Sequence, residues 1–368
     1  MWSIYYKSWF IPLIIWLLSL YSSLLYSFRH FTITSDSLLE YNTYILFIRQ
    51  GYWSPAIDNM LSSALWTTYV PSVIQRATNI NEEYLYRLWL AIVVSFLPMV
   101  VYLLVSKYTS KAVSVGIAII VFTSFYYQGY AEYARMLIAI TMAVCLLTSI
   151  LNRSRWKYLL IVLSASGLII AHYSTAYIWD GMLIGACLIM LAACVVWRKD
   201  VTYLLPVVYS VLLLNILMWF YYGDGLVSAV GQYANSARFY IGKELTDIVT
   251  ALGDNGMADQ AKVVWTLPTD ILAARVLLLS RIGIASAIWI MLFRDKRAWT
   301  IEGISYFGVI CVAIIAVSFK TIEVTIGSLR PSFIIMPLEF LGLAYWWGNR
   351  GNDWRLYPLL AIGAVVYH

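Results

Sequence analysis

Charged residues are scarce in this chain. Asp, Glu, Lys and Arg make up 12% of the 368 residues, whereas hydrophobic residues make up 62% and the mean hydropathy is +0.76. A soluble domain usually carries about 25% charged residues. The composition therefore excludes a soluble globular protein and predicts an all-α polytopic membrane protein.

The chain also lacks the common motifs of soluble enzymes. It contains no Walker A loop, no glycine fingerprint of a dinucleotide-binding fold, no HExxH and no CxxC. Its cysteines all fall inside apolar runs, where a thiol usually behaves as a small buried hydrophobic group. They are Cys145, Cys187, Cys194 and Cys311. Chemistry driven by a bound nucleotide is therefore not expected, and no motif indicates a cofactor.

The basic residues are distributed unevenly. The net charge of +6 would by itself suit a nucleic-acid partner. Lys and Arg gather, however, in short loops that alternate with apolar runs, as they do in the cytoplasmic loops of membrane proteins. These loops hold Lys107 and Lys111; Arg153, Arg155 and Lys157; and Arg294, Lys296 and Arg297. We therefore expect no nucleic-acid partner, a cytoplasmic N-terminus and a multi-pass plasma-membrane location.

A series of apolar runs is long enough to cross a bilayer, which needs about 20 residues each. They lie near 9–28, 86–105, 112–128, 132–151, 156–172, 178–197, 202–221, 271–293, 301–319 and 329–347, and a shorter run covers 356–367. The pattern predicts a single transmembrane domain over 1–368 with about 11 transmembrane helices.

Two long loops fall on the extracytoplasmic side of this topology. The first covers 29–85 and is predicted to contain two helices that lie in the membrane interface. One helix is expected within 37–50, and the other within 57–77, where Pro71 breaks the pattern. The first helix has an apolar stripe formed by Leu38, Tyr41, Ile45 and Ile48. The second loop, 222–270, is rich in Gly and polar residues and is predicted to act as a flap.

Asp36 and Glu40 are the first candidates for chemistry. They lie one helical turn apart in the first long loop, shortly after the first span. Two carboxylates at this spacing beside the bilayer indicate a shared task. One can act as a general base while the other orients a substrate, and the pair can also hold a divalent metal.

Further ionisable groups gather at span ends on the same side. Glu132 and Arg135 begin the fourth span at a spacing that suits either a structural ion pair or an active site. His172 and Tyr173 end the fifth span, where the imidazole can bind phosphate or a metal, or can hydrogen-bond a neighbouring helix. Arg330 precedes the tenth span, and its guanidinium suits a phosphodiester. This one-sided arrangement favours chemistry at one membrane face over alternating access.

Four short motifs resemble a known family. They are Ser35-Asp36 with Glu40-Tyr41, Gly51-Tyr52-Trp53-Ser54-Pro55, Ala134-Arg135 and Ala171-His172-Tyr173-Ser174. In this order, and over roughly residues 30–180, they resemble mainly archaeal multispan proteins assigned to the glycosyltransferase-C superfamily. The resemblance implies a glycosyltransferase-C-like fold and a polyprenyl-phosphate-linked sugar as donor. Asp36 matches the catalytic acid of the superfamily's first loop, although Ser37 follows it instead of a second acid.

The reaction that the resemblance implies is inverting sugar transfer to an acceptor hydroxyl at the extracytoplasmic face. Asp36 would accept the hydroxyl proton and Glu40 would orient the acceptor or share a divalent metal with Asp36. Arg135, Arg330 and His172 would hold the departing lipid phosphate. The supporting residues would be Glu132 and Tyr173. The expected partners are membrane lipid, the lipid-linked donor and additional membrane subunits.

Two other functions stay open on the sequence alone. The carboxylates would also suit the gate of a transporter or of a flippase for lipid-linked oligosaccharides. A non-catalytic subunit of a membrane assembly would carry the same spans.

The charge distribution predicts which loops an impermeant thiol reagent reaches in intact cells. In a background without native cysteines, Asn255→Cys should react, because 222–270 is expected outside. Ser154→Cys should stay unlabelled, because its loop is expected in the cytoplasm. Labelling of Ser154→Cys alone would invert the topology.

Overall fold

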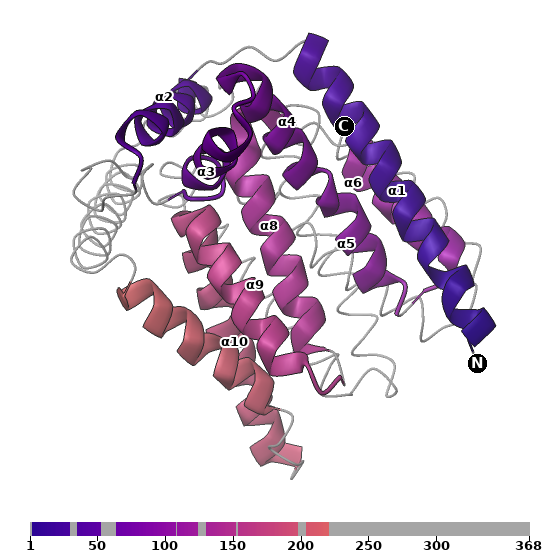
Figure 1. The fold of residues 1–368 in the computed structure, drawn as a ribbon. Helices are drawn as coiled ribbons and strands as arrows, with labels where there is room; N and C mark the ends of the chain where they lie inside the picture. The colour runs from indigo at the N-terminus through magenta and orange to yellow at the C-terminus, as the bar shows by residue number, and fades with distance from the viewer. Residues whose placement is uncertain are drawn as a thin grey trace, which may run out of the picture.

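The computed structural model describes residues 2–29, 35–52, 64–107, 109–123, 130–151, 154–197 and 204–220, and these residues form helices and short connections with no strand (Figure 1). Arg330, the predicted flap 222–270 and the predicted spans beyond it lie outside the described residues. The all-helical class is confirmed for the part of the chain that is described.

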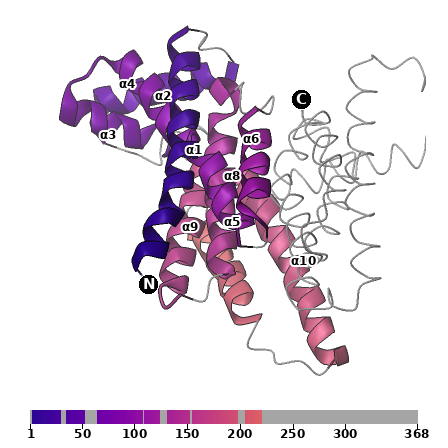
Figure 2. The ribbon, with the colours of Figure 1, turned by 90° about the vertical axis from the view of Figure 1, so that its right-hand side faces the viewer.

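Helices account for most of the described residues. Their bounds are α1 Trp2–Arg29, α2 Ser35–Gln50, α3 Tyr69–Thr78, α4 Glu82–Val94, α5 Phe96–Val105, α6 Lys111–Thr123, α8 Tyr130–Ile150, α9 Lys157–Ala171 and α10 Tyr173–Trp197. A further helix covers Leu205–Phe220. Figures 1 and 2 show α2 and α3 at the end of the bundle opposite the N-terminus of the chain. We call this the α2 end.

Three helical segments are long and apolar enough to cross a membrane. They are Phe10–Arg29, Glu82–Val105 and Tyr133–Ile150. Shorter apolar helices cover Lys111–Thr123, Lys157–Ala171 and Leu205–Phe220. These segments coincide with predicted runs and are consistent with a helical membrane protein.

The segment Glu82–Val105 is divided into α4 and α5 at Ser95. Pro98 has no N–H to continue the hydrogen-bond ladder, so the helix breaks one turn before it. The Ser95 hydroxyl donates to the Ile92 carbonyl at 2.6 Å. At the other end, the Asn81 side chain accepts hydrogen bonds from the N–H groups of Glu83 and Tyr84 and caps α4. This cap fixes where α4 begins, at the α2 end.

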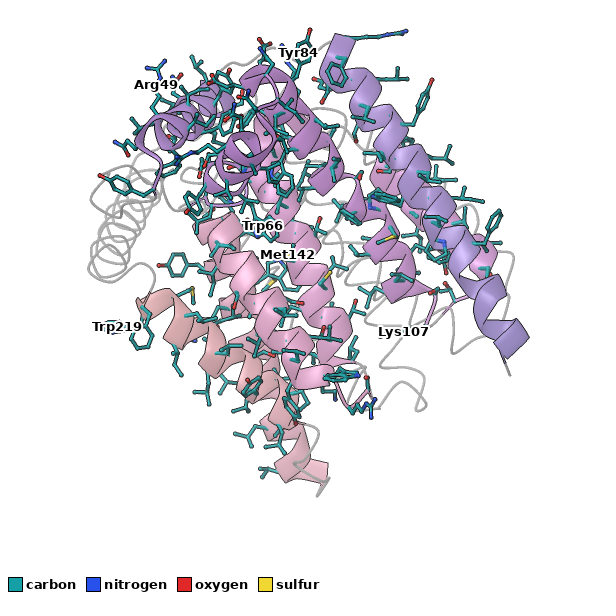
Figure 3. All side chains as sticks on the ribbon, viewed as in Figure 1. Arg49, Trp66, Tyr84, Lys107, Met142 and Trp219 are labelled. Atoms are coloured by element: carbon teal, nitrogen blue, oxygen red, sulfur yellow. The ribbon has the colours of Figure 1, made fainter. Side chains whose placement is uncertain are left out.

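Helix α8 lies in the middle of the buried core and packs against α2, α4, α5, α9 and α10. It approaches α9 closely at Gly167. A Cβ atom at Gly167 would lie 2.8 Å from Sδ of Met142 in α8, so the absence of a side chain allows the two helices to approach (Figure 3).

Trp66 joins the connection before α3 to the bundle. Its indole N–H donates to the Gly167 carbonyl at 3.2 Å, and its own carbonyl accepts from the Trp89 indole at 2.6 Å. The two indole rings are stacked with centroids 6.2 Å apart. These bonds tie residue 66 to α4 and to α9, and so hold the α2–α3 region against the bundle.

Helix α1 is attached to α4 at the same end. The Arg87 Nη1 group donates to the Ser27 carbonyl at 2.9 Å, and the Ser27 hydroxyl donates to the Arg87 carbonyl at 3.3 Å. Arg87 also pairs with Glu83 one turn earlier. The other face of α1 exposes large apolar side chains, as expected for a lipid-facing helix: Phe10, Leu13, Leu17, Leu18 and Tyr21.

The structure corrects two details of the predicted interfacial helices. The buried face of α2 is centred on Glu40 and Tyr44, at 2% and 0% exposure, while Leu38 is 44% exposed. Tyr41, Ile45 and Ile48 are partly buried against the core, as expected for the stripe. Pro71 does not break a helix. It lies in the first turn of α3, where its missing N–H is tolerated.

The contact at Gly167 predicts a position-specific loss of stability. Gly167→Leu should lower the free energy of unfolding by about 1–3 kcal/mol, because the new side chain meets Met142. Gly116→Leu in α6 is the matched control, since no atom lies within 4 Å of its Cβ position. Thermal unfolding in detergent measures both. Equal losses for the two variants would contradict a special approach of α8 and α9.

Candidate functional site

A buried ion pair joins α2 to α8 at the α2 end. Arg135 Nε lies 2.5 Å from Oε1 of Glu40, and the side chains are 12% and 3% exposed. Both residues were predicted as site residues, but in separate roles. The structure brings them into direct contact although they lie 95 positions apart in the sequence (135 − 40).

Local backbone geometry places the two side chains. Glu40 lies on the buried face of α2 with Tyr44 and Phe47. Helix α8 has a non-helical residue at Tyr133, with φ −117° and ψ 16°, two positions before Arg135. A break at this point lets the first turn of α8 differ in direction from the rest of the helix. Arg135 therefore lies in the first turn of the regular part of α8, which packs against α2.

Three tyrosines pack together beside the ion pair. The ring centroids of Tyr41, Tyr44 and Tyr86 lie 5.2 to 5.7 Å apart. The Tyr44 hydroxyl donates to the Glu82 carbonyl at 3.1 Å. Burial raises the pKa of Tyr44, and the nearby Glu82 raises it further. Burial also raises the pKa of Tyr41, so both phenols stay protonated at neutral pH.

The environment of the pair makes each charge depend on the other. In a poorly hydrated region, the attraction between a carboxylate and a guanidinium is much stronger than in water. Removing both charges from water is costly, however, and a lone buried charge is costlier still. The Glu40 carboxylate and the Arg135 guanidinium therefore stabilise each other. A ligand that binds the guanidinium in place of Glu40 also changes the free energy of the carboxylate.

Asp36 is the second residue of α2, one turn before Glu40. A carboxylate in the first turn of a helix is favoured by the helix dipole. Glu132 lies in the first turn of α8, and Tyr173 is the first residue of α10. The side chains of these three residues are outside the described part of the chain, so their predicted roles stay predictions.

His172 links α9 to α10 and has an extended backbone with φ −160° and ψ 111°. Its Nδ1 atom lies 2.7 Å from the Thr175 hydroxyl, and the Ser174 hydroxyl lies 3.2 Å from its Nε2 atom. These contacts orient the imidazole at the start of α10. Its predicted contact with phosphate is not tested by them.

The predicted metal site does not gain support from the described residues. Among them, no three His, Cys, Asp or Glu side chains lie close enough to hold a metal ion. The described carboxylate of the predicted pair, Glu40, binds the Arg135 guanidinium instead. A cation next to Glu40 would have to compete with that guanidinium.

Sequence reasoning missed an acidic residue inside a predicted span. Asp180 of α10 is 6% exposed. Its Oδ1 and Oδ2 atoms accept from the Asn215 amide at 3.1 and 3.0 Å, which joins α10 to the helix Leu205–Phe220. The signal was present in the sequence, because an acid within an apolar run is a functional candidate by default.

Comparison of the chain with protein-family models and with curated proteins gives no match.

The burial of the pair predicts an asymmetric response to mutation. Arg135→Gln should cost about 3–5 kcal/mol of stability, because it strands the more deeply buried carboxylate. Glu40→Gln should cost less, since the guanidinium is closer to solvent. The double variant should lose less than the sum of the two, because neither charge remains. Additive losses in thermal or chemical unfolding would show that the two side chains are not coupled.

Proposed function

We propose that the protein is a membrane glycosyltransferase of the glycosyltransferase-C type. It moves a sugar from a polyprenyl-phosphate-linked donor to an acceptor hydroxyl, with inversion, at the extracytoplasmic membrane face. The observation that supports this most is the buried Arg135–Glu40 pair, with Asp36 one turn from Glu40 on α2.

Arg135 suits the donor phosphate in this proposal. A guanidinium presents a planar set of donors that matches two phosphate oxygens. Arg135 is the more exposed member of its pair, at 12% against 3% for Glu40. A lipid phosphate at the end of the bundle would therefore meet the guanidinium before it meets the carboxylate.

The orientation of the protein is part of the proposal. At the end away from α2, the connections after α5 and α8 carry Lys107, Lys111 and Lys157 without a carboxylate, whereas the α2 end carries cations and carboxylates together (Figure 2). By the positive-inside rule, that end is cytoplasmic and the α2 end is extracytoplasmic. The α2 and α3 helices then lie at the depth of the lipid headgroups.

The proposed reaction uses the carboxylate of Asp36 as general base. The acceptor oxygen attacks the anomeric carbon and gives its proton to Asp36. The bond from the anomeric carbon to the phosphate oxygen breaks, and its electron pair stays on the released polyprenyl phosphate. Arg135 stabilises that developing charge, with Arg330 and His172 as further phosphate contacts. Base catalysis contributes typically about 10²–10⁴-fold.

The remaining residues have positioning roles. Glu40 holds Arg135 in place before the donor binds and lies one turn from Asp36 on α2, where it would orient the acceptor. The supporting residues in this scheme are Glu132 and Tyr173. A divalent metal between Asp36 and Glu40 is not required by the proposed reaction, because Arg135 supplies the positive charge.

A second candidate function is favoured by one observation. Asp180 and Asn215 place a carboxylate and its amide partner within apolar helices. Such groups often mark ion or proton pathways in transporters. Uptake of substrate into sealed vesicles that is lost in Asp180→Asn would favour transport, whereas sugar transfer that is unchanged in this variant would favour the enzyme.

Replacement of the base tests the proposed function. Asp36→Asn keeps the shape of the side chain but removes its basic carboxylate, so transfer from a polyprenyl-phosphate sugar should fall by about 10²–10⁴-fold. Expression and unfolding temperature should stay close to wild type. Glu82→Gln is the matched control, because it removes a carboxylate from the first turn of α4 at the same end. Wild-type transfer by Asp36→Asn would refute the mechanism.

A further inference from the structure

Tyr86 carries a hydrogen-bond donor that the described structure does not use. The residue lies on α4 with 0% exposure, and within the described part of the chain its hydroxyl has no hydrogen-bond partner. Buried polar groups in native proteins are nearly always paired, and an exception needs an explanation. An unpaired buried hydroxyl is unfavourable, which points to a partner that it acquires in another state.

The neighbours of Tyr86 identify that partner. The Tyr86 ring packs against the ring of Tyr44, with centroids 5.2 Å apart, and Glu40 lies one turn before Tyr44 on the same buried face of α2. The charges nearest to the phenol in electrostatic effect are those of Glu40 and Arg135. An ionised carboxylate is an acceptor only, and a phenol can donate to it. The neighbouring Tyr44 hydroxyl is already engaged with the Glu82 carbonyl. Glu40 is therefore the acceptor that suits Tyr86.

The burial of the ion pair indicates when Glu40 would gain from a hydrogen bond with Tyr86. Arg135 is the member nearer to solvent, and Glu40 is almost fully enclosed. A phosphoryl anion that binds the guanidinium weakens the contact between Arg135 and Glu40. A carboxylate at 2% exposure has little water to compensate for that loss, so a hydrogen-bond donor from the protein stabilises the bound state.

We propose that Tyr86 is a positioning residue: its hydroxyl donates a hydrogen bond to the Glu40 carboxylate when the Arg135 guanidinium binds a phosphoryl anion. The ligand-free state has the Glu40–Arg135 pair and a phenol with no hydrogen-bond partner among the described residues. The bound state has a Glu40–Tyr86 hydrogen bond and an Arg135–phosphate contact. No proton is transferred, and Tyr86 does not touch the ligand. The inference rests on the proposed function for the identity of the ligand, a polyprenyl phosphate.

The test is a double-mutant cycle that measures binding and not turnover. The full-length protein in nanodiscs of zwitterionic lipid is titrated with polyprenyl phosphate, for wild type, Tyr86→Phe, Glu40→Gln and the double variant. Tyr86→Phe should weaken binding about tenfold or more, because one hydrogen bond to a charged group is lost in the bound state. In the Glu40→Gln background, Tyr86→Phe should have almost no effect, since no buried charge needs the phenol.

Tyr44→Phe is the matched control. It removes a hydroxyl from the same tyrosine cluster, but one that is already bonded to the backbone. Its affinity for polyprenyl phosphate should equal that of wild type, and its unfolding temperature without ligand should fall. Tyr86→Phe should unfold without ligand at the wild-type temperature or above it, because it loses no hydrogen bond. A lower unfolding temperature for Tyr86→Phe would indicate a structural role and contradict the exchange.

Other outcomes are equally decisive. Wild-type affinity in Tyr86→Phe, or no binding of polyprenyl phosphate by wild type, would overturn the inference. An equal loss in both Glu40 backgrounds would also overturn it, because Tyr86 would then act without Glu40. Competition by inorganic phosphate or by phosphatidylglycerol nanodiscs identifies the source of the anion. Binding that depends on Tyr86 without any sugar transfer would uphold the exchange and refute the proposed function alone.

Discussion

A carboxylate and a guanidinium that are both removed from water have to stay together, and the α2 end is built around that requirement. Glu40 and Arg135 come from helices far apart in the sequence, and their contact fixes how α2 sits against α8. Separating them would leave a charge where little water can reach it. The pair thus determines which face of α2 is turned toward the bundle, and Glu40 lies at the centre of that buried face.

The surrounding helices stabilise this arrangement from several directions. Tyr41, Tyr44 and Tyr86 pack α2 against α4. Trp66 connects the segment before α3 to both α4 and α9 through its indole and its carbonyl. At the edge, reciprocal bonds between Ser27 and Arg87 attach α1. A packed apolar bundle thereby holds the Arg135 guanidinium against Glu40, and the proposed phosphate recognition depends on this fixed position.

The sequence predicted the helices well because long apolar runs have few alternatives. The runs near 9–28, 86–105 and 132–151 reappear as the long apolar segments of the structure. The rotation of α2 was harder to predict, since apolar residues lie all around the helix. Leu38 was assigned to the apolar stripe but is 44% exposed, whereas Tyr44, outside that stripe, is fully buried. Hydrophobicity disfavours a buried Glu40, and its contact with Arg135 accounts for the burial. The Asp180–Asn215 contact was likewise invisible until the two helices were placed side by side.

Recognition of a lipid phosphate by Arg135 is the central claim, and binding of polyprenyl phosphate to Arg135→Lys in nanodiscs tests it most directly. Lysine keeps the positive charge but loses the planar pair of donors. The account predicts that affinity falls about tenfold or more relative to wild type, while binding of the uncharged polyprenol stays the same. Equal affinity of the two proteins for polyprenyl phosphate would contradict the account, because the guanidinium would then have no part in holding the phosphate.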